Sequence, residues 1–223
     1  MTQMKLDNIW NYYMSLEGDF TNTSRFIEPI NQEDVYSFEF AKLLILSCTE
    51  IESLLKLLCI ELSGNKCGNM GEYKDVILSY FPKIVFAEVY IPRWAKTVLP
   101  FSGWDAGKLS WWDTYSDIKH DRSNNFKDAT YKNAVYALAA LYILILYLAQ
   151  MKKIHINDSD STYIISEYSS KYLVCSPSRQ LPDFEQQNPP SSAGRVESVN
   201  TLFNQEEAPQ SEHNGDIWIR CEK

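Results

Sequence analysis

Hydrophobic residues recur every three or four positions over a long stretch in the first third of the chain. Residues 38–62 place large apolar side chains at this spacing, with no proline or glycine between them, and Gly64 follows. The pattern predicts a long amphipathic helix that buries one face and ends at Gly64.

A second stretch, residues 134–149, is apolar on nearly every face of a helix. Such a helix must be buried in protein or in lipid. Over this range it would rise only ~24 Å at ~1.5 Å per residue, less than the ~30 Å hydrocarbon core of a bilayer. Its three tyrosines also favour a protein interior that offers partners for their hydroxyl groups. We therefore predict a central core helix that packs against residues 38–62, and no membrane span.

Shorter patterns complete a helical bundle. A short helix is expected over residues 73–81 and another over 110–122, with Ser110 as its N-terminal cap and an interruption at residues 123–125. Between these helices, residues 82–107 combine prolines and glycines with many aromatic residues, which predicts an ordered loop.

The last third of the chain has a different composition. Residues 162–175 are rich in Tyr, Ile and Val, which predicts two short strands and a turn. Residues 176–223 hold five of the nine prolines and are acidic, as in a solvated tail. We therefore predict an all-α helical domain over residues 1–153, a β-hairpin appendage over 154–175 and an irregular, acidic C-terminal tail over 176–223.

Composition and charge narrow the classes of function. Hydrophobic residues make up 45% and charged residues 22% of the 223 residues, which excludes a chain that is disordered throughout. The net charge of −8 argues against a broad basic surface for duplex DNA, so any contact with nucleic acid has to be local. The first residues show no apolar run after their charges, so we expect no secretory signal and a cytoplasmic protein.

Motifs of metal or cofactor chemistry are not found in the sequence. The five cysteines show no C-x-x-C or Cys/His ligand spacing. The chain has no glycine-rich phosphate loop, no H-E-x-x-H and no G-x-S-x-G motif. We therefore expect no metal and no cofactor.

The most specific local feature is the run from Trp111 to Arg122, WWDTYSDIKHDR. Lys119, His120 and Arg122 are expected on the last turn of one helix, where the helix dipole favours cations, and Asp117 lies three residues before the histidine. A histidine that moves a proton, beside cations that stabilise charge on phosphate oxygens, suits phosphodiester chemistry. A solvated helix end with ordinary capping cations is the alternative.

Glu52 and Lys56 form a second feature, on the helix predicted over residues 38–62. They are four residues apart with the acid first, which is the favourable order for a surface ion pair. Apolar residues share the same helical stripe, so the pair is also a candidate to order a neighbouring site.

These features, in this order along the chain, resemble the HEPN superfamily of small α-helical bundles. E-x-x-x-K from Glu52 to Lys56, then W-W-x-x-Y-x-x-x-K-H-x-R, then a long Ala/Leu/Tyr-rich helix are similar to the prokaryotic subset with a K-H-x-R signature, over about residues 38–149. The resemblance implies a HEPN-like bundle that forms a homodimer with a shared cleft. It also implies a metal-independent endoribonuclease or RNA-binding component of a toxin–antitoxin or phage-defence system, with single-stranded RNA as its partner.

The resemblance assigns roles to single residues. His120 would be the catalytic proton-transfer residue, and Lys119 and Arg122 would bind the scissile phosphate. The substrate-binding positions would be Glu52, Lys56, Tyr115, Ser116 and Asp117.

One position departs from the family pattern, which is R-x4-6-H with a polar residue after the arginine. With the histidine aligned on His120, Tyr115 stands at the arginine position and Ser116 at the polar one. A non-catalytic HEPN-like dimerisation or protein-interaction module is therefore the alternative function, with residues 176–223 as the segment that engages a partner protein.

Aromatic residues gather before and within the motif. They offer stacking surfaces for unpaired bases or, alternatively, wedge the preceding loop against the bundle. These residues are Trp94, Phe101, Trp104, Trp111, Trp112 and Tyr115.

Overall fold

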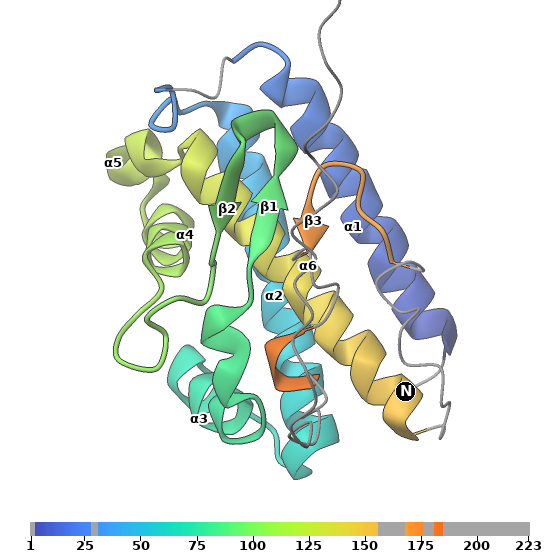
Figure 1. Ribbon diagram of the computed structural model, residues 1–223. Coiled ribbons are helices and arrows are strands. Elements are labelled where there is room, and N and C mark those ends of the chain that lie inside the picture. Colours follow the sequence, from blue (N-terminus) through green and yellow to red (C-terminus); the bar gives the residue numbers. More distant parts are fainter. Residues whose placement is uncertain (1–2, 28–30, 156–167, 176–180, 185–223) are drawn as a thin grey trace, which may run out of the picture. The chain divides into compact units, whose positions relative to one another are not determined.

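The computed structural model describes residues 3–27, 31–155, 168–175 and 181–184 of the chain. These residues are mostly helical and include one small antiparallel sheet (Figure 1). The α-helices are α1 (Gln3–Ser24), α2 (Phe38–Ser63), α3 (Met70–Tyr80), α4 (Ser110–His120), α5 (Arg122–Asn125) and α6 (Tyr131–His155). The strands are β1 (Val89–Ile91), β2 (Lys96–Val98) and β3 (Val174–Cys175). The short 3₁₀ helices are η1 (Pro82–Phe86), η2 (Pro92–Trp94), η3 (Phe126–Asp128) and η5 (Pro182–Phe184).

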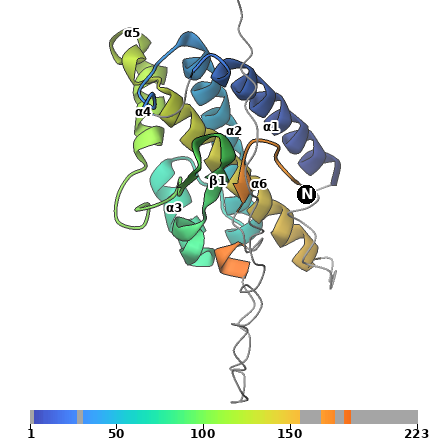
Figure 2. The same ribbon diagram turned by 45° about the horizontal axis from the view of Figure 1, so that its top comes forward.

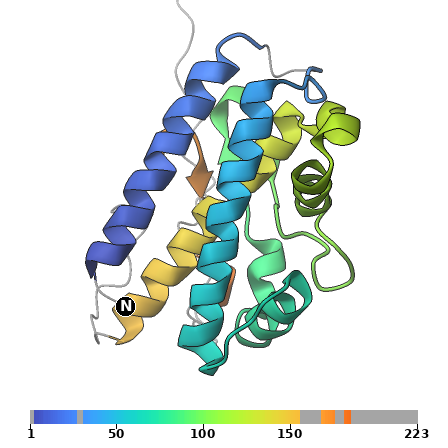
Figure 3. The ribbon, with the colours of Figure 1, turned by 180° about the vertical axis from the view of Figure 1, so that it is seen from behind.

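α6 lies at the centre of the helical bundle, as its hydrophobic pattern predicts. It is contacted by α1, α2 and α4. Figures 1 and 3 show α2 on one side of α6 and the sheet on the other. The side chains of Leu138, Leu141, Ile145 and Leu148 are at most 1% exposed, which confirms the predicted core helix. Each leucine buried in this way contributes ~1.5–3 kcal/mol relative to an exposed side chain.

α6 is longer than the apolar pattern predicts. The pattern covers residues 134–149, whereas the 22 residues of Tyr131–Lys152 are long and apolar enough to cross a membrane. The argument from length against a membrane span is therefore wrong. The argument against a membrane span is instead burial, because 89% of the most apolar window of this helix is enclosed by the rest of the structure, as in a core helix.

Local signals set the ends of α2. The Ser37 side chain accepts a hydrogen bond from the backbone N–H of Phe40 at 3.1 Å and so caps the first turn. Gly64 adopts a φ of 74°, a left-handed conformation that costs glycine little, and its N–H donates to the carbonyl of Ile60 at 2.9 Å. The predicted end at Gly64 is confirmed.

The sheet corrects the all-α prediction. β1 and β2 form an antiparallel hairpin within residues 82–107, where we expected an ordered loop. β3 pairs with the other edge of β1, with Val89 opposite Cys175, and Figure 2 shows it between β1 and α1. The fold is therefore mostly α with a three-stranded antiparallel sheet. Strands of two or three residues carry too few alternating positions for the pattern to identify them.

A buried carboxylate bonds the segment before β3 to α1. Glu17 is 3% exposed and accepts hydrogen bonds from the hydroxyl groups of Tyr13 and Ser170 and, at 3.0 Å, from the backbone N–H of Tyr172. Residues 168–175 are thus fixed on the helical bundle. Residues 156–167 of the predicted appendage lie outside the described residues. The predicted tail also lies outside them, apart from residues 181–184.

Candidate functional site

α4 turns one apolar face towards the bundle. Trp111, Tyr115 and Ile118, at spacings of four and three residues, are each at most 3% exposed. The indole N–H of Trp111 donates to the carbonyl of Pro100 at 2.7 Å, which ties α4 to the preceding loop. The positions between these residues are left for the polar side chains of the motif.

The start of α4 differs from the prediction by one residue. Leu109 is the N-cap and makes no side-chain hydrogen bond, and Ser110 is the first helical residue. The predicted serine cap is therefore wrong. Asp113 lies in the first turn, where its negative charge interacts favourably with the positive end of the helix dipole.

The end of α4 divides the motif between two helices. α4 ends at His120, and α5 begins at Arg122. Between them, the Asp121 carboxylate accepts hydrogen bonds from the backbone N–H of Asn124 at 3.3 Å and from its side-chain amide at 2.6 Å. The predicted continuous helix, with its interruption after Arg122, is therefore wrong, because the Asp121 cap starts a new helix.

The structure brings four predicted site residues together where α2 and α4 pack. Lys56 Nζ lies 2.7 Å from Glu52 Oε1 on α2. On α4, Lys119 Nζ lies over the ring of Tyr115, 5.4 Å from its centroid. Glu52 acts electrostatically on Lys119, and Lys119 on Lys56, so the two pairs are neighbours. We call Glu52, Lys56, Tyr115 and Lys119 the α2–α4 cluster.

Both lysines of the α2–α4 cluster are held in the charged form. A hydrogen bond to Glu52 raises the pKa of Lys56 above its ordinary value, although Lys119 opposes this shift. A hydrogen bond with Tyr115 raises the pKa of Lys119, and Glu52 adds to the increase. Two ammonium groups therefore stay charged at neutral pH in one region, as contact with phosphate oxygens requires.

The remaining predicted residues lie on the exposed side of α4 and on α5. His120, Asp117 and Arg122 are exposed, and Ser116 is half-buried. Ser116 and His120 share a face of α4 because they are four residues apart. Within the part of the chain that the structure describes, the side chains of His120 and Arg122 have no hydrogen-bond or ion-pair partner. Both are open to a ligand.

The chain matches no protein-family model, no curated protein and no solved structure. Among the described residues, no three His, Cys, Asp or Glu side chains are placed to hold a metal ion. The candidate function is therefore argued from the motif and from the geometry of its residues.

The aromatic residues around the motif belong to the core. Of the six rings that the sequence offers for base stacking, five are at most 8% exposed, and the sixth, Trp112, is partly buried against the core. The base-stacking hypothesis for these rings is wrong. They wedge the loop before α4 against the bundle, as the alternative predicts.

Sequence reasoning missed a second group of rings, of which Phe38 and Tyr36 are exposed and Phe126 is partly buried against the core. Phe38 is 70% and Tyr36 52% exposed, and the ring centroid of Phe126 lies 4.6 Å from that of Phe38 and 5.6 Å from that of Tyr36. We call these three rings the aromatic platform. One signal in the sequence could have indicated this group. Phe126 follows Arg122 by four residues, so the two are expected on the same side of the helical segment that begins at Arg122.

Tyr73 of α3 is another residue that the sequence does not indicate. It is 1% exposed, and its hydroxyl has no hydrogen-bond partner among the described residues. Burial raises the pKa of this hydroxyl, Lys56 lowers it and Glu52 raises it, so Tyr73 borders the α2–α4 cluster. Its position depends on how α3 packs against α2, which residue spacing does not reveal.

Proposed function

We propose that this chain is a HEPN-like protein that binds single-stranded RNA and cleaves it without a metal ion. In this proposal it acts in the cytoplasm as a component of a toxin–antitoxin or phage-defence system, and it forms a homodimer. His120 is the catalytic residue, and Lys119 and Arg122 bind the scissile phosphate.

The observation that supports this proposal most is the exposure of His120 beside two cations. His120 ends α4, next to Lys119, and the exposed Arg122 starts α5 two residues later. The Lys119 ammonium lies over the ring of Tyr115, and the charge of Glu52 favours its charged form. Since no group among the described residues bonds the side chain of His120, this histidine is free to contact a substrate.

The chemistry needs no group beyond these side chains and the RNA itself. The 2′-hydroxyl of RNA is the nucleophile: its oxygen bonds to phosphorus as its proton passes to His120. The bond from phosphorus to the 5′ oxygen breaks, and that oxygen takes a proton from water. Lys119 and Arg122 stabilise the charge that develops on the phosphate oxygens. The products carry a 2′,3′-cyclic phosphate and a 5′-hydroxyl end.

The test is degradation of single-stranded RNA by the purified full-length protein in the presence of EDTA. We expect cleavage that yields 2′,3′-cyclic phosphate ends, and loss of both RNA affinity and turnover in Arg122→Ala. Cleavage that EDTA abolishes, or products with 5′-phosphate ends, would contradict the mechanism.

A second candidate function is a non-catalytic HEPN-like interaction module. One observation favours it: Tyr115, at the family's arginine position, is 3% exposed and uncharged, so this position offers no cation to a phosphate. In that case the protein dimerises and residues 176–223 engage a partner protein. A dimer in light scattering together with no RNA binding and no cleavage would select this function over the first.

A further inference from the structure

The aromatic platform is built where the loop before α2 meets the start of α6. Tyr36 forms an isolated antiparallel bridge with Thr130. The backbone N–H of Tyr131 donates to the carbonyl of Val35 at 2.8 Å, and that of Lys132 to the carbonyl of Glu33 at 3.0 Å. These bonds hold the loop in place, so the exposed rings of Tyr36 and Phe38 are positioned against the partly buried ring of Phe126.

A hollow adjoins the platform. It has a volume of about 360 Å³ and is lined by Asn31, Gln32, Asp34, Val35 and Tyr36. Tyr36 belongs to both the hollow and the platform, so the two are continuous. The amide and carboxylate side chains at its rim are exposed, and groups of these types hydrogen-bond the edges of nucleic-acid bases.

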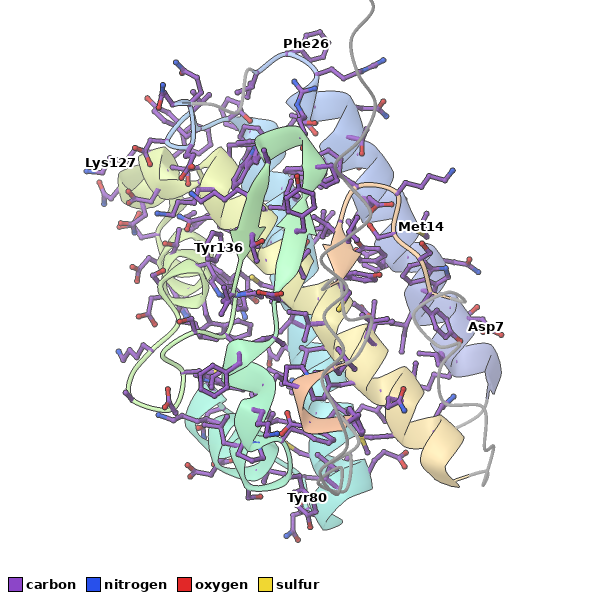
Figure 4. All side chains as sticks on the ribbon, in the orientation of Figure 1. Asp7, Met14, Phe26, Tyr80, Lys127 and Tyr136 are labelled. Atoms are coloured by element: carbon purple, nitrogen blue, oxygen red, sulfur yellow. The ribbon has the colours of Figure 1, made fainter. Side chains whose placement is uncertain are left out.

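The charges around the platform complement a phosphate backbone. Arg122, Lys127 and Lys132 are exposed and, within the described residues, form no ion pair. In Figure 4, Lys127 extends outwards from the end of the molecule where α5 lies. Two acids of the adjoining loop and helix are paired: Glu33 Oε1 lies 2.8 Å from Lys96 Nζ, and Glu39 is bound to Lys42. The carboxylate of Asp34, which lines the hollow, is exposed and forms no ion pair within the described residues.

We propose that the aromatic platform stacks an unpaired base of single-stranded RNA and that the hollow receives the edge of the adjacent base. This inference rests on the proposed function and adds to it how the strand is selected. Exposed rings with unpaired cations next to them are the arrangement that binds single strands, because every base has a face to stack and every phosphate a charge to neutralise. In a duplex the faces of the bases are covered by their neighbours, so the platform selects single strands.

The position of Arg122 links this surface to the site of cleavage. Arg122 lies one helical turn before Phe126, so a phosphate held by Arg122 is flanked by a base within reach of the platform. The scissile phosphate therefore lies next to a stacked base, and the platform positions the strand for His120.

The test measures the affinity of full-length protein variants for RNA in a His120→Ala background, so that the RNA stays intact. The probes are a short single-stranded RNA with one 2-aminopurine base, the same RNA with an abasic residue at that position, and its duplex. Phe126→Leu and Phe38→Leu remove a platform ring and keep an apolar side chain. Phe86→Leu is the matched control, since Phe86 is 64% exposed and lies on η1, outside the platform.

Loss of one platform ring should weaken binding of the single strand by about 5-fold or more, because base stacking on an aromatic ring contributes ~1–3 kcal/mol. The same variants should change binding of the abasic RNA by less than about 2-fold and should lose the quenching of 2-aminopurine fluorescence that stacking causes. Phe86→Leu should behave like the parent protein.

Two results would contradict the proposed role of the platform, and they distinguish its failure from a failure of the proposed RNA function. If the parent protein binds and the wild type cleaves RNA but Phe126→Leu and Phe38→Leu change nothing, the platform is wrong and the nuclease stands. If the protein binds no RNA and these variants instead reduce its mass in light scattering, the rings contact a second copy of the chain, and both the platform and the RNA function are wrong.

Discussion

Between Ala134 and Ala149 of α6 nearly every side chain is buried, whereas most side chains between Asp117 and Lys127 are exposed. In α6, packing determines which residue types are tolerated, because each side chain must fill space next to its neighbours. At the α4–α5 end, Lys119, His120 and Arg122 have few internal contacts, and exchanging such surface residues usually changes stability by less than ~0.5 kcal/mol. The fold therefore places few constraints on these residue types, and the proposed function is what assigns them to binding and chemistry.

The largest expected effect is in the core. Leu141→Ala should lower the free energy of unfolding by ~2–5 kcal/mol, because the leucine is fully buried and its removal leaves a cavity in α6. Urea unfolding followed by circular dichroism measures this change. Lys127→Ala, at the exposed end, is the control and should change stability by less than ~0.5 kcal/mol. A loss below ~1 kcal/mol for Leu141→Ala would show that α6 is not the centre of the core.

A smaller effect is expected at the buried carboxylate of α1. Glu17→Gln should destabilise by ~1–3 kcal/mol, because a side-chain amide has one acceptor oxygen for the donors of Tyr13, Ser170 and Tyr172 and brings an N–H group that needs a partner. Asp75→Asn, at an exposed position of α3, should leave stability unchanged. Equal unfolding curves for the two variants would indicate that the segment before β3 contributes nothing to the fold.

Alkaline pH tests the burial of α6 through the ionisation of Tyr147. Burial raises the pKa of Tyr147, which also donates a hydrogen bond to Asp183 at 2.8 Å. The folded protein keeps this proton above pH ~10 while the unfolded chain loses it, so the stability contributed by Tyr147 is complete below pH ~10 and declines as the pH rises further. Tyr147→Phe should therefore reduce the alkaline loss of unfolding free energy by up to ~1.4 kcal/mol per pH unit. Urea titrations at a series of pH values measure this slope.

The exposed Tyr80 supplies the control for this titration. Tyr80→Phe removes a hydroxyl from a side chain that is 51% exposed and should change the free energy of unfolding by less than ~0.5 kcal/mol. A slope that Tyr147→Phe does not alter would mean that this hydroxyl ionises as readily in the folded protein as in the unfolded chain.

The same contrast explains what the sequence predicts and what it does not. α2 and α6 follow from hydrophobic spacing and from Gly64, because burying a stripe of large side chains is a strong and local signal. The break at Asp121 does not follow, because an aspartate cap contributes only ~1 kcal/mol and competes with continuation of the helix. The β1–β2 hairpin is completed by the pairing of β1 with β3, a partner remote in sequence, which the loop-like composition of residues 82–107 does not reveal.

The candidate site shows the same division. The ion pair of Glu52 and Lys56 follows from their spacing of four residues on α2, whereas the position of Lys119 beside it depends on how α4 packs against α2. Phe38 joins the platform from a segment remote in sequence from Phe126, and Tyr73 reaches the α2–α4 cluster from α3. Contacts of this kind come from tertiary packing, and one sequence alone holds no spacing that predicts them.

The central claim is that His120 serves chemistry and not folding, and His120→Ala tests it most directly. Its expected effect on stability is the smallest of all, less than ~0.5 kcal/mol in urea unfolding, because the side chain is exposed and has no hydrogen-bond or ion-pair partner within the described part of the chain. In EDTA, the same variant should cleave single-stranded RNA ~10²- to 10⁴-fold more slowly than wild type, as for removal of a general acid or base. His155→Ala, at the last residue of α6, is the control and should cleave normally. Cleavage by His120→Ala at the wild-type rate would contradict the account.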